Sequence, residues 1–475
     1  MAALLAAIYL VTSVLIASHR LFWYDEIFTI TITRLPNVAT IWKALAHNSD
    51  TQPPTYYMLV RMFEQLPIRR EVAARLPSAL AMVAGMLITF DCTRRLSDGV
   101  HGLIAFSVLS CSELCYYGYE ARPYALYFML ASLALWIWLH ASDASKLSSV
   151  LFGVVIFLAV AVHYYAVLCL VPYAAWEVSN WRSGRTPSGK LIAGCLAVVC
   201  AAAIFARQIL ALREFSGHFW DRPTFSSLAA IFNDFFPYGL FPLAAIMILV
   251  ALVGPRVKGA MASAMQPYER LGWFFGLIPV AGFILATLGT GAFYNRYFIS
   301  ILPGIAVAFS CLLWRQFKSA PLISIATLML FGTLGLGIQF ALVRYPDLVR
   351  PPSAKSEPGR VNAMLLLDDK MQTNAKQFIV LQANDLLAVE AGYYAKHPEK
   401  YVFLVAPQWH DGITGGLIHL GQYSPMRFWT LDDLKAHARE TTLVDPARLT
   451  VAALEKAGYK VTGRIDGDLQ VVSVE

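Results

Sequence analysis

The chain has 475 residues, of which 57% are hydrophobic and only 15% are charged, and its formal net charge is +7. A soluble protein carries charge on about a quarter of its residues, whereas the mean hydropathy here is +0.54. This composition excludes a large soluble globular core. The basic residues lie mostly in short connections between apolar runs, which argues against nucleic acid as a partner and favours a membrane.

Long apolar runs fill the chain up to residue 342. A helix that crosses a membrane needs about 20 apolar residues, and we count 11 candidate spans. Residues 2–18 are expected to be the first span, because they lack the basic start of a signal peptide. Residues 147–178 could form one long tilted helix or two short ones broken near His163. The runs are 2–18, 72–92, 100–117, 121–140, 147–161, 164–178, 191–210, 228–253, 271–289, 297–314 and 320–342.

Charge in the connections predicts their sides of the membrane. Alternate connections carry 11 basic residues, and the positive-inside rule makes those connections cytoplasmic. A split at His163 keeps this alternation intact and therefore favours two short helices there. The extracytoplasmic side would then hold residues 19–71, 118–122, His163, 211–227, 290–296 and the tail from about 343.

The first external loop, residues 19–71, contains two adjacent acids, Asp25 and Glu26, in the motif LFWYDE. Carboxylates are costly near hydrocarbon and are usually kept there because they pair, bind or catalyse. The simpler interpretation of Asp25 is a cap on a helix over Ile27–Ile32. For Glu26 it is structural pairing.

Two further features of this loop are predicted from local pattern. Val38–Leu45 reads as a short amphipathic helix along the membrane interface. In DTQPPTYY, the prolines start a new helix whose first turn contains Tyr56 and Tyr57. Asp50 caps that helix or contacts substrate, and the two tyrosines are interfacial aromatics or donor contacts.

The chain changes character after residue 342. Residues 344–360 are rich in proline and charge, which is typical of a linker. We expect a transmembrane domain at 1–342, a linker at 343–360 and a small extracytoplasmic α/β domain at 361–475. The predicted elements of the tail are strands at 378–382 and 401–406, helices at 385–396, 431–440 and 446–457, and a hairpin of 459–465 with 469–474.

Three other external segments carry polar groups at the same predicted face. They are YEARPY with Glu120 and Arg122, the histidine of HYY at His163, and YNRY with Arg296 and Tyr297. Arginine binds phosphate through its bidentate fork and stays charged beside apolar surroundings, while a carboxylate can deprotonate a hydroxyl. This inventory fits transfer of a sugar from a lipid-phosphate donor, with inversion if one carboxylate acts as base and no covalent sugar forms.

The ordered motifs FWYDE, PPTYY, RLPSAL, YEARPYAL, HYY and NRYFISILP resemble the GT-C glycosyltransferases. Within them the chain is similar to the family-39 protein mannosyltransferase and aminoarabinose-transferase group. The resemblance covers roughly residues 1–342. It implies an all-α polytopic membrane enzyme, here with about 11 transmembrane helices and a small C-terminal α/β soluble domain.

The resemblance also implies roles for single residues. Asp25 matches the catalytic acid of the first loop and Glu26 its companion. Arg122 and Arg296 match positions expected to contact phosphate or support the scaffold. Gln52 departs from the family, whose members often have His or Lys near the donor phosphate, so contact of this loop with the phosphate or with a metal is in doubt.

The expected partners are a polyprenyl-phosphate-sugar donor, the membrane, and a glycan, lipid or protein acceptor, with no nucleic acid. No cofactor is certain, and a divalent metal ion is left open. A bacterial inner membrane is the expected location, with the active site facing the periplasm. Two alternatives remain: a transporter or flippase of lipid-linked sugars, and a membrane scaffold whose tail binds a partner. Arg122 and Glu120 could simply neutralise each other, Arg296 could reach lipid headgroups, and His163 could be a satisfied polar group of a bundle.

Overall fold

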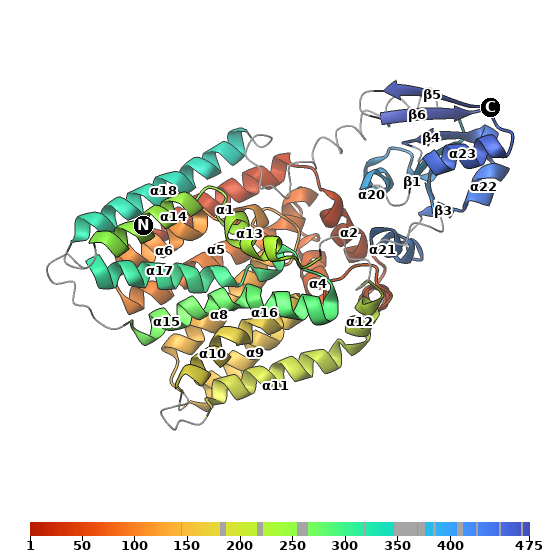
Figure 1. Ribbon diagram of the computed structural model, residues 1–475. Coiled ribbons are helices and arrows are strands. Elements are labelled where there is room, and N and C mark those ends of the chain that lie inside the picture. Colours follow the sequence, from red (N-terminus) through yellow and green to blue (C-terminus); the bar gives the residue numbers. More distant parts are fainter. Residues whose placement is uncertain are drawn as a thin grey trace. The chain divides into compact units, whose positions relative to one another are not determined.

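The computed structural model in Figure 1 describes residues 1–143, 145–180, 187–215, 222–253, 265–317, 320–345, 368, 376–382, 386–405, 412–423, 426–445, 448–466 and 469–475. The chain divides into two compact units. The first comprises Met1–Arg20, Gln52–Leu210 and Asp221–Ser353. The second comprises Leu21–Thr51, Ala211–Trp220 and Ala354–Glu475.

The first unit is built from helices. The central helix α5 packs on α8, α1 and α6, while α9 packs on α11 and α15 packs on α17. The elements are α1 (Ala2–His19), α4 (Pro54–Phe63), α5 (Arg70–Leu96), α6 (Gly99–Ser110), α7 (Leu114–Tyr117), α8 (Tyr124–His140), α9 (Lys146–Val162), η1 (Tyr164–Cys169), α10 (Leu170–Asn180), α11 (Gly189–Ile204), α12 (Ala206–Ala211, whose last residue falls in the second unit), α13 (Phe225–Phe235), α14 (Leu240–Val253), α15 (Pro267–Phe274), η5 (Phe275–Leu277), α16 (Ile278–Leu285), η6 (Ala286–Thr290), η7 (Asn295–Phe298), α17 (Ile301–Phe317) and α18 (Pro321–Arg344).

Several helices are long and apolar enough to cross a membrane. Within the described residues there are four, namely α1, α5, Pro267–Thr290 and α18, and α13 with α14 makes a fifth if that bent pair is one span. Five other apolar helices have only 10–17 residues. The chain is therefore an integral membrane protein by length and composition of its helices, but the 11 predicted spans are not confirmed.

Some predicted runs are interrupted where the sequence blocks a helix. The run 228–253 is two helices bent by 90°, and Pro237 lies in the break, where it cannot donate a helical hydrogen bond. The run 147–178 is broken at His163, so the interpretation as two short helices is confirmed. The predicted helices at 38–45 and after the two prolines are confirmed as α3 (Val38–Ala46) and α4.

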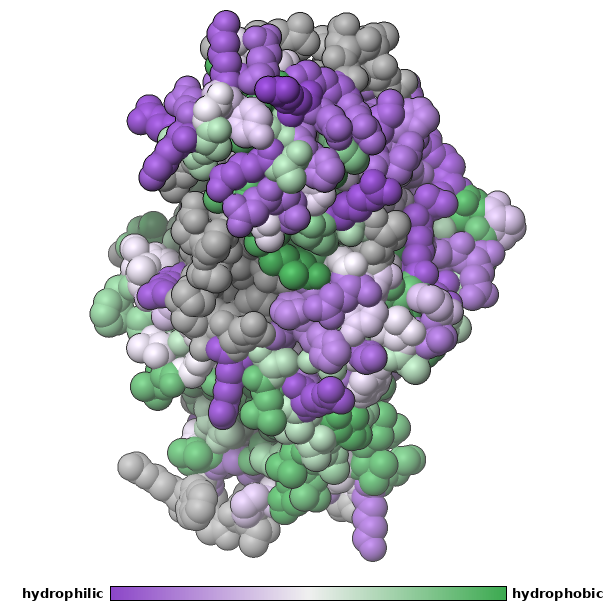
Figure 2. Space-filling model, turned by 90° about the vertical axis from the view of Figure 1, so that its right-hand side faces the viewer, coloured by the Kyte–Doolittle hydropathy of each residue, from purple (hydrophilic) through white to green (hydrophobic). Residues whose placement is uncertain are grey.

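Close helix packing depends on glycine at two contacts. A Cβ on Gly85 of α5 would lie 2.5 Å from Cε1 of Phe128 on α8, and a Cβ on Gly272 of α15 would lie 2.7 Å from the carbonyl oxygen of Gly304 on α17. Small residues let helix backbones approach in this way within membranes. Outward-facing side chains are large and apolar, including Leu147 (66% exposed) and Leu322 (79% exposed), and Figure 2 shows many hydrophobic residues on the surface in the lower part of its view.

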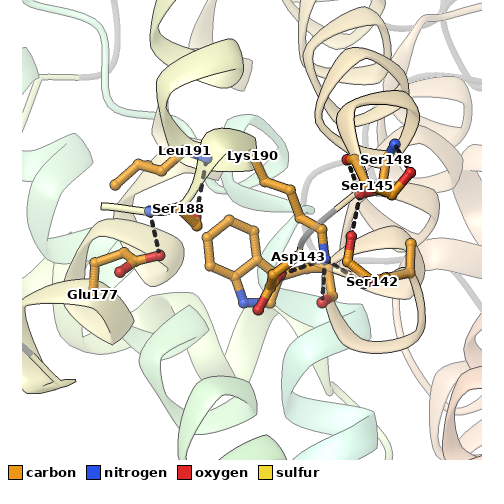
Figure 3. Close-up of polar contacts among 10 residues, drawn as sticks. Ser142, Asp143, Ser145, Ser148, Glu177, Ser188, Lys190 and Leu191 are labelled. Atoms are coloured by element: carbon orange, nitrogen blue, oxygen red, sulfur yellow. Dashed lines mark hydrogen bonds and ion pairs between the residues drawn. The ribbon is translucent and has the colours of Figure 1, made fainter. Parts of the chain in front are cut away.

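A buried lysine joins α11 to the end of α8 and to the connection that follows it (Figure 3). Lys190, at the start of α11, is fully buried, and its Nζ donates to the carbonyl oxygens of Trp138 at 3.1 Å and Ala141 at 2.6 Å. It also pairs with Asp143 at 2.8 Å. Because both carbonyls belong to the C-terminal end of α8, the ammonium satisfies acceptors that the helix itself leaves open.

A largely buried ion pair joins α15 to α17. Nε of Arg315 lies 2.8 Å from Oε2 of Glu269, and its Nη2 donates to Oε1 at 2.9 Å. Glu269 is fully buried. The bidentate geometry is the strong form of such a pair.

The second unit combines the segment Leu21–Thr51 with the C-terminal domain. Its elements are α2 (Tyr24–Thr33), α3, η3 (Leu212–Phe215), β1 (Phe378–Gln382), α20 (Leu386–Tyr394), η9 (Pro398–Lys400), β2 (Tyr401–Leu404), α21 (Gly412–Gly421), β3 (Arg427–Trp429), α22 (Leu431–Ala436), η10 (Ala438–Glu440), β4 (Thr441–Val444), α23 (Arg448–Lys456), β5 (Val461–Asp466) and β6 (Leu469–Val474). The sheet has the order β3-β2-β1-β4-β6-β5. Strands β3, β2, β1 and β4 are parallel, whereas β6 runs antiparallel to β4 and β5.

The fold of this sheet follows from its apolar strands. Val380, Val402, Leu443 and Val472 belong to one buried cluster contributed by four strands, and the parallel pairs are joined by helices as such crossovers require. The predicted strands of β1, β2, β5 and β6 are confirmed within one or two residues at each end. The short strands β3 and β4 and the helix α21 were not predicted. Most of the expected linker lies outside the described residues.

Candidate active site

The centre of the candidate site is the break between α9 and η1. His163 has extended backbone torsions there (φ −153°, ψ 124°), and its Nδ1 accepts a hydrogen bond from the backbone N–H of Tyr165 at 3.2 Å. The imidazole stacks on Tyr127, with ring centroids 5.4 Å apart and planes 8° apart. Tyr297 lies 5.1 Å away, centroid to centroid. These contacts fix the ring, and an accepting Nδ1 places the proton of a neutral imidazole on Nε2.

The second ring nitrogen of His163 is a buried donor. The side chain is 2% exposed, and Nε2 has no hydrogen-bond partner among the described residues. Burial, with the positive charges of Arg122 and Arg296 as smaller causes, lowers the pKa of His163 to about 3. The imidazole is therefore neutral at physiological pH. It presents an N–H in a region that also feels the positive charges of Arg122 and Arg296, a suitable environment for an anionic oxygen.

Arg122 is held in a turn between α7 and α8. It is buried, and its backbone N–H donates to the carbonyl of Glu120 at 2.8 Å. The carbonyl of Arg122 accepts a hydrogen bond from Ser78 at 3.0 Å, and the Ser78 hydroxyl also shares a 2.7 Å hydrogen bond with Tyr56. Motifs on α4, α5 and the 118–123 turn, which are distant in sequence, thus meet in one hydrogen-bonded chain.

Arg296 lies in η7 and is supported by aromatic rings. Its guanidinium carbon is 4.6 Å from the ring centre of Tyr294 and 5.2 Å from that of Tyr124. The side chain is 8% exposed, which rules out the simple interpretation that it reaches out to lipid headgroups. Asn295 accepts from the backbone N–H of Arg296 at 2.6 Å and donates to Oε2 of Glu113 at 3.3 Å.

Two acids belong to this neighbourhood. Glu120 is fully buried, Glu113 is 3% exposed, and both lie near the phenol of Tyr117, as does Arg296. Glu113 was missed by the sequence analysis. Its signal was present, because a lone carboxylate inside the apolar run 100–117 is the kind of residue that a membrane protein keeps for a purpose.

Three other predicted residues lie at the start of α4. Gln52 is 4% exposed, and its Oε1 accepts no hydrogen bond from the described residues. Tyr56 and Tyr57 are each 1% exposed. They are therefore buried side chains of the bundle, and the interpretation of them as interfacial belt aromatics is wrong.

Asp25, Glu26 and Asp50 belong to the second unit. The helix α2 begins at Tyr24, so Asp25 lies in its first turn, and the backbone N–H of Trp23 donates to Oε2 of Glu26 at 3.2 Å. Glu26, which is fully buried, therefore caps the start of this helix. Oδ1 of Asp50 accepts from the backbone N–H of Thr51 at 2.6 Å.

No group of three or more His, Cys, Asp or Glu side chains suited to a metal ion is found in the part of the chain that the structure describes. The charged groups that act on His163 are the guanidinium groups of Arg122 and Arg296, which are hydrogen-bond donors. Such donors fit an anion better than a divalent cation, whose preferred ligands are carboxylate and carbonyl oxygens. No chemical step is therefore assigned to a metal.

Comparison with known proteins supports the resemblance inferred from the motifs. A family model described as dolichyl-phosphate-mannose-protein mannosyltransferase matches residues 51–205. The crystal structure of ArnT from Cupriavidus metallidurans bound to undecaprenyl phosphate has a TM-score of 0.61 and 14% identity, covering 99% of this chain and 97% of that chain. The apo structure of the same protein has a TM-score of 0.58, with the same identity and coverage. No curated protein sequence matches the chain.

The matched range and the fold have different extents. The family model spans the residues from Gln52 to His163 that form much of the site, whereas Asp25 and Arg296 lie outside it. The structural similarity covers nearly the whole chain, including the C-terminal domain. The predicted resemblance to GT-C glycosyltransferases is confirmed, and at 14% identity the ArnT structures show a shared fold.

Proposed function

We propose that this chain is an integral-membrane glycosyltransferase that moves a sugar from a polyprenyl-phosphate donor to an acceptor hydroxyl or phosphate. The observation that carries the proposal is the buried His163 Nε2–H lying near the guanidinium groups of Arg122 and Arg296. A structural histidine would normally have both nitrogens satisfied. The family resemblance and the undecaprenyl phosphate bound by ArnT support a lipid phosphate as the ligand.

The proposed phosphate site works by electrostatic stabilisation of the leaving group. When the bond between sugar and phosphate breaks, negative charge develops on the phosphate oxygens. Arg122 and Arg296 would hold those oxygens through guanidinium N–H groups. His163 would donate a hydrogen bond from its Nε2–H to a phosphate oxygen. Because the imidazole is neutral, it would act as a hydrogen-bond donor and not as an acid. Tyr297 packs against His163 and Tyr124 against the guanidinium of Arg296, so both rings would border the bound phosphate.

Asp25 is proposed as the base. Its place in the first turn of α2 keeps it on a fixed backbone, and Glu26, its family companion, secures the start of that helix through the Trp23 N–H. Asp25 would remove the proton of the acceptor hydroxyl as that oxygen attacks the anomeric carbon. With one carboxylate as base and no covalent sugar intermediate, the anomeric configuration inverts.

The proposed topology places the catalytic face and the C-terminal domain outside the cytoplasm, in a bacterial inner membrane. The basic residues of alternate connections support this orientation. The 11 apolar runs would supply the spans, with helices of 17 residues such as α9 and α17 crossing where the bilayer thins or the helix end is extended by a turn. The acceptor remains a glycan, a lipid or a protein.

The test is a transfer assay with purified protein in lipid nanodiscs. A radiolabelled polyprenyl-phosphate sugar is incubated with candidate acceptors, and Asp25→Asn is compared with Glu26→Gln. We expect Asp25→Asn to lower kcat by roughly 10²–10⁴-fold, whereas Glu26→Gln, which keeps an acceptor for the Trp23 N–H, retains most of the rate. Undiminished transfer by Asp25→Asn would remove this residue from the mechanism.

Two further outcomes of the same assay bear on the proposal. NMR of the product reports the anomeric configuration, and a retained configuration would overturn the inverting mechanism. Movement of the donor across a proteoliposome without any chemical product would instead identify a flippase.

A further inference from the structure

The segment that carries Asp25 is held at both ends by contacts with the C-terminal domain. Residues 21–51 and the domain that begins about 330 residues later form one compact unit, and α2 packs against α20, as Figure 1 also shows. In addition, hydrogen bonds from the C-terminal domain reach the segment just before α2 and just after α3.

The first contact, just before α2, is made by a single tyrosine hydroxyl. Tyr394, the last residue of α20, accepts a hydrogen bond from the backbone N–H of Phe22 at 2.6 Å and donates to the carbonyl of the same residue at 3.3 Å. Phe22 is fully buried, and its ring meets Tyr393 edge to face at 6.0 Å. Both backbone polar groups of one residue are therefore satisfied by a side chain from the distant domain.

The second contact holds the other end of the segment, just after α3. The hydroxyl of Tyr423, two residues after α21, lies 2.6 Å from Nδ1 of His47, the residue that ends α3. The backbone of Gly416 packs on the next residues, since a Cβ built there would lie 3.6–3.7 Å from the carbonyl oxygens of Ser49 and Asn48. The segment is thus held before its first helix and after its second.

The backbone between the Tyr394 contact and Asp25 is short and hydrogen-bonded. Only Trp23 and Tyr24 separate Phe22 from Asp25, and the turn is closed by the hydrogen bond from Trp23 N–H to Glu26 and by that from Thr29 to the carbonyl of Asp25. We infer that the C-terminal domain positions the catalytic carboxylate, with Tyr394 as the principal positioning residue and Tyr423 as its counterpart at the far end. The inference rests on the proposed role of Asp25.

A positioning role for Tyr394 predicts a specific effect on the kinetics of sugar transfer. Tyr394 touches no reacting atom, so its loss should lower kcat by allowing the base to drift, and a shift of about 1 Å can cost about 10²-fold. The donor phosphate is assigned to Arg122, His163 and Arg296 in the other unit. The KM for the donor should therefore stay close to its wild-type value.

The test compares Tyr394→Phe with Tyr459→Phe in the full-length protein in nanodiscs. Both changes remove one hydroxyl and keep the ring. Tyr459 is a matched control, because its hydroxyl donates to the carbonyl of Lys435 at 2.9 Å inside the same domain, away from residues 21–51. The readouts are kcat and KM for the polyprenyl-phosphate sugar, and amide hydrogen exchange of a peptide that covers residues 21–33.

We expect Tyr394→Phe to lower kcat about tenfold or more, with KM within about twofold, and to speed exchange in the 21–33 peptide. Tyr459→Phe should change neither. Unchanged kcat and exchange in Tyr394→Phe would overturn the inference, as would an effect confined to KM. If the wild-type protein transfers no sugar, the proposed function fails. Faster hydrogen exchange in Tyr394→Phe, but not in Tyr459→Phe, would still show that Tyr394 holds residues 21–33 in place.

Discussion

Lys190 and His163 are both buried nitrogen bases of the first unit, yet their surroundings differ in kind. Around Lys190 the ammonium has two carbonyl acceptors and a carboxylate partner. Around His163 one nitrogen is satisfied and the other has no hydrogen-bond partner among the described residues, while the positive charges of two arginines act on the ring. A structural polar group is stabilised by complete pairing, whereas a binding site keeps hydrogen-bonding capacity for a ligand at a cost in stability. The difference separates scaffold from site within one bundle.

The sharpest way to break this comparison is to weaken one arginine of the proposed site and one arginine of a fully paired structural contact. Arg296→Lys keeps a positive charge in the proposed site but loses the planar fork, so we expect kcat/KM for sugar transfer to fall by roughly 10- to 100-fold. Arg315→Lys makes the same change in the pair with Glu269, where the fork is bidentate. It should lower stability while leaving kcat per folded molecule within about threefold.

Steady-state kinetics on both variants, with the folded fraction measured by size-exclusion chromatography, separates a loss of catalysis from a loss of folded protein. Equal losses of kcat/KM in the two variants would mean that Arg296 acts only through the fold.

Lys190→Met tests the scaffold side of the comparison. Methionine fills a similar volume but leaves the carbonyls of Trp138 and Ala141 buried without their donor, which should lower the free energy of unfolding by about 2–4 kcal/mol. Asp143 is 78% exposed. Its replacement by Asn should therefore cost less than about 1 kcal/mol, as for surface ion pairs.

Unfolding in mild detergent, followed by circular dichroism, measures both variants. A larger loss for Asp143→Asn than for Lys190→Met would show that the ion pair, rather than the capped carbonyls, secures this junction.

Local pattern predicted much of the fold because its signals are local. The break at His163 followed from charge parity, and the helix after Pro53 followed from the fixed torsion of proline. The strands β3 (RFW) and β4 (TTLV) escaped prediction because each is short and begins with polar residues, whereas the equally short β2 (YVFL) is a continuous apolar run. The bend between α13 and α14 was signalled by Pro237, but apolarity on both sides made a single run the simpler interpretation.

The candidate site was predictable only in part, because its geometry depends on contacts between distant segments. Arg122, His163 and Arg296 were found as polar residues at one predicted face. The aromatic residues that hold them, such as Tyr124 and Tyr127, are indistinguishable in sequence from ordinary membrane-helix residues. Likewise, nothing local distinguishes Tyr394 as a partner of Phe22 some 370 residues earlier.

The smallest expected effect concerns the pH dependence of stability. Because the pKa of His163 is about 3 in the folded protein and about 6.5 when unfolded, the unfolded chain binds a proton in this window that the folded chain does not. Stability from this residue is therefore present above pH 6.5 and is lost as the pH falls, by about 1.4 kcal/mol per pH unit. Between pH 7.5 and pH 5.0 the wild-type protein should lose about 2 kcal/mol more than His163→Gln, which does not titrate.

Denaturant unfolding at the two pH values measures this difference, and His397→Gln serves as the control because the side chain of His397 is 51% exposed. Other groups that titrate in this range are the same in the wild-type protein and in His163→Gln, so the difference between these two isolates His163. If His163→Gln loses as much stability on acidification as the wild-type protein, the imidazole is not held neutral by its surroundings. The distinction between a paired Lys190 and a His163 that awaits a ligand would then lose its electrostatic basis.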